Sequence, residues 1–314
     1  MPEWLIERGI GETRAVLVED GEIVEARIEP EGTARAGSVV AARLKQAAVP
    51  AVAVAERIEY LLPKGAPGVT EGAPLNIEVT REAIPGGEPW KRPLACIVEE
   101  PICEALALTG HDLRFPGPRD MLGEVGWNEL IEDARSGIVR FPGGELRISP
   151  TPAMTLIDVD GYLAPAELSV LGATEAAKAI RRLDIGGSIG IDLPTVGNKA
   201  ARQASAQAVD AHMPQPFERT AVNGFGFLQI VRPRRRASMV ELAQEHAVFE
   251  ARALLRRAAF EKPGAKRIVA HPAVIAVLEN KARWIDALSR QSGGAIGLRA
   301  DPALPMSGGY AESV

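Results

Sequence analysis

The sequence predicts a chain of mixed α and β structure that passes from an α+β first half to an α/β second half. Two observations carry this prediction. Short β-rich stretches separated by Gly and Pro fill roughly the first hundred residues, and helical stretches alternate with apolar strands after residue 150. With 314 residues, 46% of them hydrophobic, the chain is long enough for about two domains with sizeable cores.

Changes in this pattern divide the sequence into five expected segments. Residues 1–36 read as a β-meander. Residues 37–98 hold five short strands, which suit a small barrel such as an OB-fold, although any small barrel is compatible with that number. Residues 99–150 form a connecting segment, residues 151–240 an α/β layer, and residues 241–314 a small αβ domain.

Hydrophobic periodicity and turn residues predict the individual elements of the second half. The expected strands are Ile138–Phe141, Leu146–Ile148, Met154–Val159, Ser188–Leu193, Val222–Val231 and Arg267–Ala270. The expected helices are Ala164–Leu183, Lys199–His212, Ala237–Phe260 and Pro272–Leu288.

Composition excludes several classes of protein. No apolar run approaches the roughly 18–20 residues that span a bilayer, and the first residues do not resemble a secretory signal, so we expect a cytoplasmic protein without a membrane partner. The two cysteines, Cys96 and Cys103, match no zinc spacing and suggest no disulfide framework.

Charge is distributed unevenly along the chain. The net charge of −5 argues mildly against a nucleic-acid partner, but residues 1–150 carry 25 acidic and 16 basic side chains, whereas residues 151–314 carry 16 and 20. Because salt screens each charge within about 10 Å, an acidic protein can still bind phosphate through a local basic cluster.

Three aspartates follow apolar strands of the α/β layer. Asp158 and Asp160 stand two positions apart, so on a strand their side chains project from the same side. Asp192 ends a second apolar strand, and the intervening helix is long enough for a crossover that makes the two strands parallel neighbours. We therefore expect the three carboxylates to meet at the carboxyl ends of the strands, where open α/β sheets place their sites.

Carboxylates held close together repel each other unless a cation lies between them. A set of oxygen ligands suits Mg²⁺ or Mn²⁺, and such an ion polarises a phosphodiester and activates water for in-line attack. The spacing thus indicates a metal site at Asp158, Asp160 and Asp192. The alternative is that these residues only cap loops and helix N-termini, because Asp commonly ends strands.

A basic cluster of four arginines leaves the expected strand Val222–Val231, which should neighbour the strand of the last aspartate. The cluster consists of Arg232, Arg234, Arg235 and Arg236. Guanidinium groups suit phosphate because they offer a planar pair of donors. The alternative is a solvated basic turn, since runs of charge usually lie at the surface.

A second set of residues belongs to the barrel-like region. Trp90, Lys91 and Arg92 interleave an aromatic ring with two cations, and Tyr60 is expected on the same barrel. Stacking combined with positive charge suits single-stranded RNA. Ordinary barrel surface is the alternative interpretation.

Several of these stretches resemble the RNase E/G family of endoribonucleases, and the two Asp-bearing strands are the specific ones. The similar stretches are Glu12–Val18, Glu71–Glu82, Ser136–Glu145, Thr155–Asp160, Ile185–Asp192, Asn223–Ile230 followed by Arg232, and the tail Ala251–Tyr310.

The resemblance implies an RNase H-like remnant with an inserted OB-fold, a DNase I-like catalytic layer and a small C-terminal domain. The magnesium-binding aspartates of that family fall on Asp158 and Asp192, which would be the catalytic residues, and Asp160 stands where relatives usually have Asn. The implied activity is Mg²⁺-dependent cleavage of single-stranded RNA that leaves a 5′-phosphate and a 3′-hydroxyl.

The chain also departs from the family's pattern. The subdomain that would supply a 5′-monophosphate pocket after the barrel is missing, and the arginine of that pocket falls on Gly224. The CxxC zinc link between subunits has no counterpart between Arg236 and His246. We therefore expect neither recognition of a 5′-monophosphate nor bound zinc.

These observations together predict a metal-dependent endoribonuclease that uses Mg²⁺, with Mn²⁺ as an alternative ion, and acts on single-stranded RNA. Whether the chain forms a homodimer is left open. The main alternative is a catalytically inactive RNA-binding protein on the same scaffold. The net acidity slightly favours a third class, an assembly factor without RNA contact.

Overall fold

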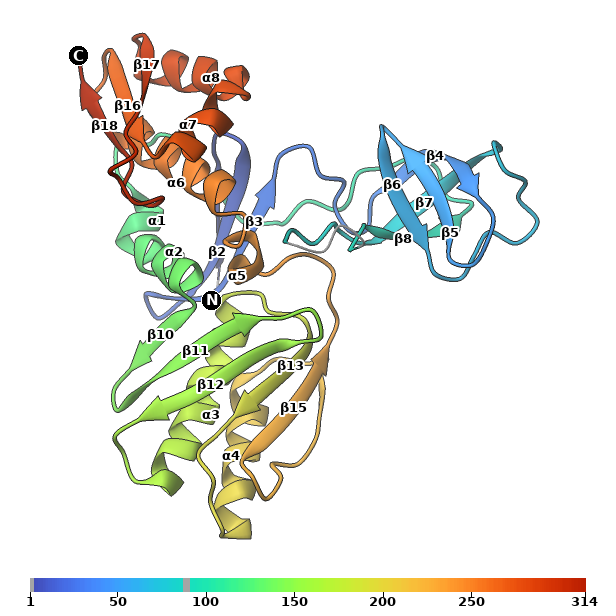
Figure 1. Cartoon of the computed structure of the whole chain (residues 1–314), viewed down its shortest axis with the longest axis vertical. Helices are drawn as coiled ribbons and strands as arrows, with labels where there is room; N and C mark the ends of the chain where they lie inside the picture. The colour runs from blue at the N-terminus through green and yellow to red at the C-terminus, as the bar shows by residue number, and fades with distance from the viewer. Residues whose placement is uncertain (1–2, 87–90) are drawn as a thin grey trace. The chain divides into compact units, whose positions relative to one another are not determined.

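The computed structural model describes residues 3–86 and 91–314, and the chain divides into two compact units. Unit 1 comprises Met1–Glu31, Thr109–Ile131 and Leu242–Val314, and unit 2 comprises Gly32–Leu108 and Glu132–Glu241. Helices, open sheets and a closed barrel occur together, which confirms the prediction of mixed α and β structure (Figure 1). In the part of the chain described, no helix is long and apolar enough to cross a membrane.

The first sheet of unit 1 has the order β3-β2-β1-β9. Its strands are β1 (Glu3–Arg8), β2 (Glu12–Glu19), β3 (Glu22–Pro30) and β9 (His111–Leu113). The first three form the expected antiparallel meander, but β9, which begins 81 positions after the end of β3, pairs parallel with β1. The barrel is thus inserted into the sequence of this sheet, and β9 from the expected connecting segment 99–150 completes the meander.

The C-terminal part of unit 1 has a small sheet of order β17-β16-β18, of which only β16 was expected. The strands are β16 (Lys266–Ala270), β17 (Ile296–Ala300) and β18 (Tyr310–Ser313), and the helices are α6 (His246–Phe260), α7 (Pro272–Glu279) and α8 (Ala282–Ser292). The short helix α5 (Met239–Leu242) precedes them in sequence and belongs mainly to unit 2. Two helices expected to be continuous are each broken. The second break follows Asn280, which caps α7 by bonding back to the Ala276 carbonyl.

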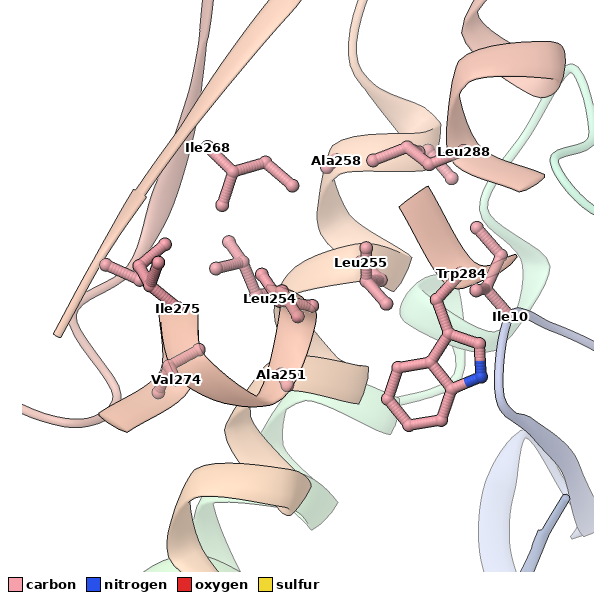
Figure 2. Close-up of a cluster of buried hydrophobic side chains, with 13 residues drawn as sticks. Ile10, Ala251, Leu254, Leu255, Ala258, Ile268, Val274, Ile275, Trp284 and Leu288 are labelled. Atoms are coloured by element: carbon pink, nitrogen blue, oxygen red, sulfur yellow. The ribbon is translucent and has the colours of Figure 1, made fainter. Parts of the chain in front are cut away.

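Apolar side chains from α6, α7, α8 and β16 form the core of this part, and Ile10 of the N-terminal segment joins them (Figure 2). Leu254, Leu255 and Trp284 are completely or almost completely buried there. Residues at opposite ends of the chain therefore share one hydrophobic core.

Unit 1 also contains a buried network of ion pairs. Arg14 donates to Glu12 and Glu7 over 2.7 and 2.8 Å. Arg256 of α6 forms a two-pronged pair with the same Glu7, at 2.9 and 3.0 Å, and also bonds Asp120. Arg14, Glu7 and Arg256 are only 1–3% exposed. Every carboxylate of this network thus faces a guanidinium, as buried charge requires.

The barrel of unit 2 is closed, with the strand order β4-β5-β6-β8-β7. Its strands are β4 (Val39–Gln46), β5 (Ala51–Ala55), β6 (Ile58–Leu62), β7 (Pro74–Arg81) and β8 (Leu94–Val98). Leu44, Leu62, Ile77 and several alanines fill the interior. The expectation of a five-stranded small barrel over residues 37–98 is therefore confirmed.

The second part of unit 2 is a six-stranded sheet of order β10-β11-β12-β13-β15-β14 (Figure 1). Its strands are β10 (Ile138–Phe141), β11 (Gly144–Pro150), β12 (Thr155–Gly161), β13 (Gly187–Asp192), β14 (Glu218–Arg219) and β15 (Phe227–Arg232). Helices α3 (Pro165–Arg182) and α4 (Lys199–His212) lie on one face. The hairpin β10–β11 extends this sheet rather than belonging to a separate segment. Two short helices, α1 (Met121–Glu124) and α2 (Trp127–Ser136), precede it.

Candidate functional site

The two Asp-bearing strands are parallel neighbours, as predicted. Their register runs from Thr155 opposite Ile189 to Asp158 opposite Asp192, so these two aspartates are direct partners across the strand pair. Helix α3 provides the crossover between β12 and β13. The carboxyl ends of both strands consequently lie at one edge of the sheet, here called the aspartate edge.

Side chains on β12 alternate between a buried and an open face. Ile157 and Val159 are buried on the side of the helices, whereas Asp158, Asp160 and Asp192 are exposed. This alternation follows from the two-residue period of a strand with only one apolar-covered face. The three carboxylates therefore project from the sheet on the side that helices α3 and α4 leave open.

The three aspartates differ in their surroundings. Within the described residues, the side chains of Asp158 and Asp192 make no hydrogen bond or ion pair. The carboxylate of Asp160 accepts a 2.8 Å bond from the Gly161 amide, and its strand partner is Glu145 on β11. No group of three or more His, Cys, Asp or Glu side chains lies close enough to hold a metal ion in the described parts of the chain. The structure thus places two of the predicted ligands, Asp158 and Asp192, opposite each other. The third, Asp160, lies two residues further along β12.

This donor set fits Mg²⁺ better than an ion that needs a full cage of protein ligands. Mg²⁺ keeps several waters and is commonly bound by one or two carboxylates together with substrate phosphates. Asp158 and Asp192 supply two exposed, unpaired carboxylates at neighbouring positions. The same pair offers no thiolate or imidazole, which zinc and copper prefer.

A pocket of about 420 Å³ opens beside the third aspartate. Asp160, Arg140, Glu145 and Tyr162 contribute to its wall, together with Phe141 and two glycines. Arg140 is largely exposed, and its guanidinium lies 3.9 Å from Glu145. A cation and an aromatic ring therefore stand next to the carboxylates.

The four predicted arginines occupy two kinds of environment. Arg234 pairs with the nearly buried Glu241, and Arg236 pairs with Asp184 at 3.1 Å, so both join parts of unit 2 to one another. Arg232 donates to the Ile185 carbonyl at 3.3 Å. Arg235 is exposed, and its guanidinium makes no hydrogen bond or ion pair with the residues that the structure describes. Only this last arginine has the solvent-facing geometry of a phosphate contact.

Among the predicted barrel residues, Tyr60 needs correction. It is 2% exposed in the barrel core, and burial raises the pKa of its phenol. A ring enclosed by the barrel cannot stack on a base, so its role is structural. Alternation with Leu62 along β6 explains why both side chains point inward.

The neighbouring cations of the barrel are partly exposed. Arg92 pairs with Glu59 at 2.6 Å, and Lys45 pairs with the same carboxylate, whose pKa the Lys45 hydrogen bond lowers. Lys91 donates to the Pro152 carbonyl at 3.2 Å. Trp90 lies outside the described residues.

Two exposed aromatic residues at the aspartate edge were missed. Tyr162 directly follows β12, and Phe225 lies two residues before β15. They are 85% and 82% exposed. The turn-forming glycines around them, Gly161, Gly224 and Gly226, are the signal that could have placed both at loops beside the strand ends.

No protein-family model matches the chain, and no curated protein sequence matches it. The chemistry of the aspartate edge therefore provides the basis for a function.

Proposed function

We propose that this protein is a metal-dependent endoribonuclease that cuts single-stranded RNA at the aspartate edge. The observation that carries the proposal is the register of Asp158 with Asp192 on adjacent parallel strands, both exposed and without a partner among the described residues. Two like charges at neighbouring positions of a sheet repel each other unless a cation binds between them.

Asp158 and Asp192 would hold Mg²⁺, with Mn²⁺ as the alternative, through one carboxylate each. When bound there, the ion would polarise the scissile phosphate and acidify a water for in-line attack, which leaves a 5′-phosphate and a 3′-hydroxyl. Asp160 follows on the same side of the strand, two residues or roughly 7 Å away. That distance suits a carboxylate that accepts a hydrogen bond from the attacking water.

The barrel supports an RNA partner. Its order β4-β5-β6-β8-β7, with β6 and β8 parallel, is compatible with an OB-fold, which binds single strands along one face. Lys45, Lys91 and Arg92 are partly exposed cations of this region. The proposal places the chain among RNase E/G-like enzymes, as a form without the 5′-end pocket.

Cleavage of a 5′-labelled, AU-rich single-stranded RNA tests the proposal. We expect cutting with Mg²⁺ and none with EDTA. Asp158→Asn and Asp192→Asn should each lower the rate by about 100-fold or more, because removing one carboxylate weakens both the ion and its position. Asp286→Asn changes an exposed aspartate of α8 and is the matched control, expected to cut like the unmodified protein.

The alternative function, RNA binding without catalysis, gives a different result in the same experiment. The RNA would then shift in a binding assay but stay intact with Mg²⁺ or Mn²⁺. Equal cutting by the unmodified protein and both Asp variants would instead remove Asp158 and Asp192 from the reaction.

A further inference from the structure

Two aromatic side chains flank the carboxylates of the aspartate edge. Tyr162 and Phe225 are the two most exposed aromatic residues in the part of the chain that the structure describes, at 85% and 82%. A large apolar ring left in water contributes little to folding, because its burial is what stabilises a protein. Their positions therefore call for an explanation outside the core.

The topology of the sheet brings both rings to the same edge. Strands β12 and β13 are parallel and end there, and β15 begins there because it is antiparallel to β13, with Asp192 opposite Phe227. Tyr162 comes immediately after β12, and Phe225 comes just before β15. In the order of the strands, Asp192 on β13 thus lies between β12, which carries Asp158 and leads to Tyr162, and β15, which follows Phe225.

The turn that carries Phe225 is held firmly by hydrogen bonds. The Asn223 side chain accepts from the amides of Phe225 and Phe227 at 2.9 and 3.1 Å, and Thr195 donates to the Phe225 carbonyl at 2.9 Å. Gly226 has a positive φ of 94°, and a Cβ there would lie 2.1 Å from the Leu193 carbonyl oxygen. The backbone is thereby fixed while the phenyl ring stays in solvent, which suits a preformed contact for a ligand.

Tyr162 is fixed in a comparable way. Its amide donates to the Gly143 carbonyl at 3.1 Å, which ties it to the β10–β11 turn. Tyr162 is one of the residues that line the 420 Å³ pocket, together with Asp160 and the exposed Arg140. The pocket therefore combines an aromatic surface, a guanidinium and a carboxylate of the aspartate edge.

We propose that Tyr162 and Phe225 each stack on a nucleobase, one on either side of the scissile phosphate, and that Arg140 contacts a phosphate on the Tyr162 side. This inference rests on the proposed function and adds the way in which the edge holds its substrate. The ion held by Asp158 and Asp192 would act on the scissile phosphate, so the nucleotides on either side of that phosphate need an attraction of their own. Stacking of single-stranded bases on aromatic rings provides it and tolerates any sequence.

The inference makes a distinctive prediction about salt. Loss of a phosphate contact lowers the slope of log affinity against log salt by roughly 0.7 for a single strand, whereas loss of a stacked base leaves the slope unchanged. Tyr162→Leu and Phe225→Leu should therefore weaken binding by about fivefold or more each, with parallel salt plots. Arg140→Ala should instead flatten the plot.

The experiment uses the full chain with Asp192→Asn, so that RNA stays intact, and a single-stranded RNA that carries 2-aminopurine at one position at a time. Stacking quenches this base, so quenching at two positions should disappear, one in Tyr162→Leu and the other in Phe225→Leu. Tyr162→Phe and Phe225→Tyr keep a ring and should keep quenching. Tyr310→Leu removes another partly exposed aromatic and is the control, expected to change nothing.

Either of two results overturns the inference. If the unmodified protein cuts RNA but both Leu variants bind and quench like their parent, the rings do not stack and the proposed function stands. If the unmodified protein neither binds nor cuts RNA, the proposed function is wrong, and the stacking inference that rests on it is wrong as well. Thermal unfolding should be unchanged in the Leu variants because both side chains are exposed.

Discussion

Two charged clusters in this protein have opposite designs. In unit 1, Glu7 is enclosed by Arg14 and Arg256, and all three side chains are buried. In unit 2, Asp158 and Asp192 are exposed neighbours that form no ion pair within the described residues, and Arg147, opposite Asp158 on β11, pairs with Glu145 instead. The first cluster satisfies its charges within the fold, whereas the second leaves two charges of the same sign for something else to satisfy. Carboxylates alone do not mark a site; carboxylates without a partner do.

The largest expected effect is a loss of stability when the buried Glu7 network is disrupted. Glu7→Gln removes the charge that both buried arginines share, so we expect a loss of about 3–5 kcal/mol in the free energy of unfolding. Urea denaturation measures it. Glu3→Gln lies on the same strand but is exposed, and should change stability by less than about 0.5 kcal/mol. Equal, small effects for both variants would show that the network contributes little to folding.

The same measurement on the aspartate edge should give the opposite sign. Asp158→Asn relieves repulsion with Asp192 and breaks no ion pair, so the free energy of unfolding should stay the same or rise by up to about 1 kcal/mol. This contrasts with the expected loss of cleavage by the same variant. A loss of 2 kcal/mol or more would mean that Asp158 has a structural partner after all.

The arginine cluster contains both a paired and an unpaired charge, on the adjacent residues Arg234 and Arg235. Arg234→Ala leaves the nearly buried Glu241 without its cation, and should lower stability by about 1–3 kcal/mol. Arg235→Ala should leave stability unchanged and reduce the salt slope of RNA binding by roughly 0.7. Parallel salt plots for Arg235→Ala would exclude this side chain from phosphate contact. Replacing the whole cluster at once would mix the two effects.

The smallest expected effect concerns the 5′ end of the RNA. Gly224 has no side chain, so this position supplies no side-chain donor to a terminal phosphate. Substrates that carry a 5′-monophosphate or a 5′-hydroxyl should therefore be cut at rates within about twofold of each other. A large preference for the monophosphate would reveal a pocket elsewhere in the chain.

Local sequence patterns predicted the features that depend on residues close together in the sequence. Apolar strands that end in Asp, joined by a helix of crossover length, were enough to place Asp158 beside Asp192. Five short strands were enough to predict the barrel. Tyr60 was misplaced although its spacing from Leu62, two residues along a strand, indicates a shared and buried side.

Other features depend on distant residues and could not be read from the sequence. The partners of Arg234 and Arg236 are Glu241 and Asp184, and only the folded chain brings Asp184 to the cluster. The exposure of Tyr162 and Phe225 was missed because aromatic residues are usually buried, although the glycines around both positions indicate loops. Strand β9 is three residues long and pairs with β1 across the whole barrel sequence, so no local pattern identifies it.

Unit 1 is built from three separate segments of the sequence, and this has a consequence for its synthesis on the ribosome. Glu7 and its partner Arg256 are 249 residues apart, so at about 5–20 residues per second the acid emerges roughly 10–50 seconds before its cation. During that interval the barrel and the six-stranded sheet, each encoded by a continuous stretch, can complete their pairing. Strands β1 to β3 are therefore made before unit 2 but belong to a unit that is completed only after it. A nascent chain that stops before α6 would hold a folded unit 2, while Glu7 would still lack its partner Arg256.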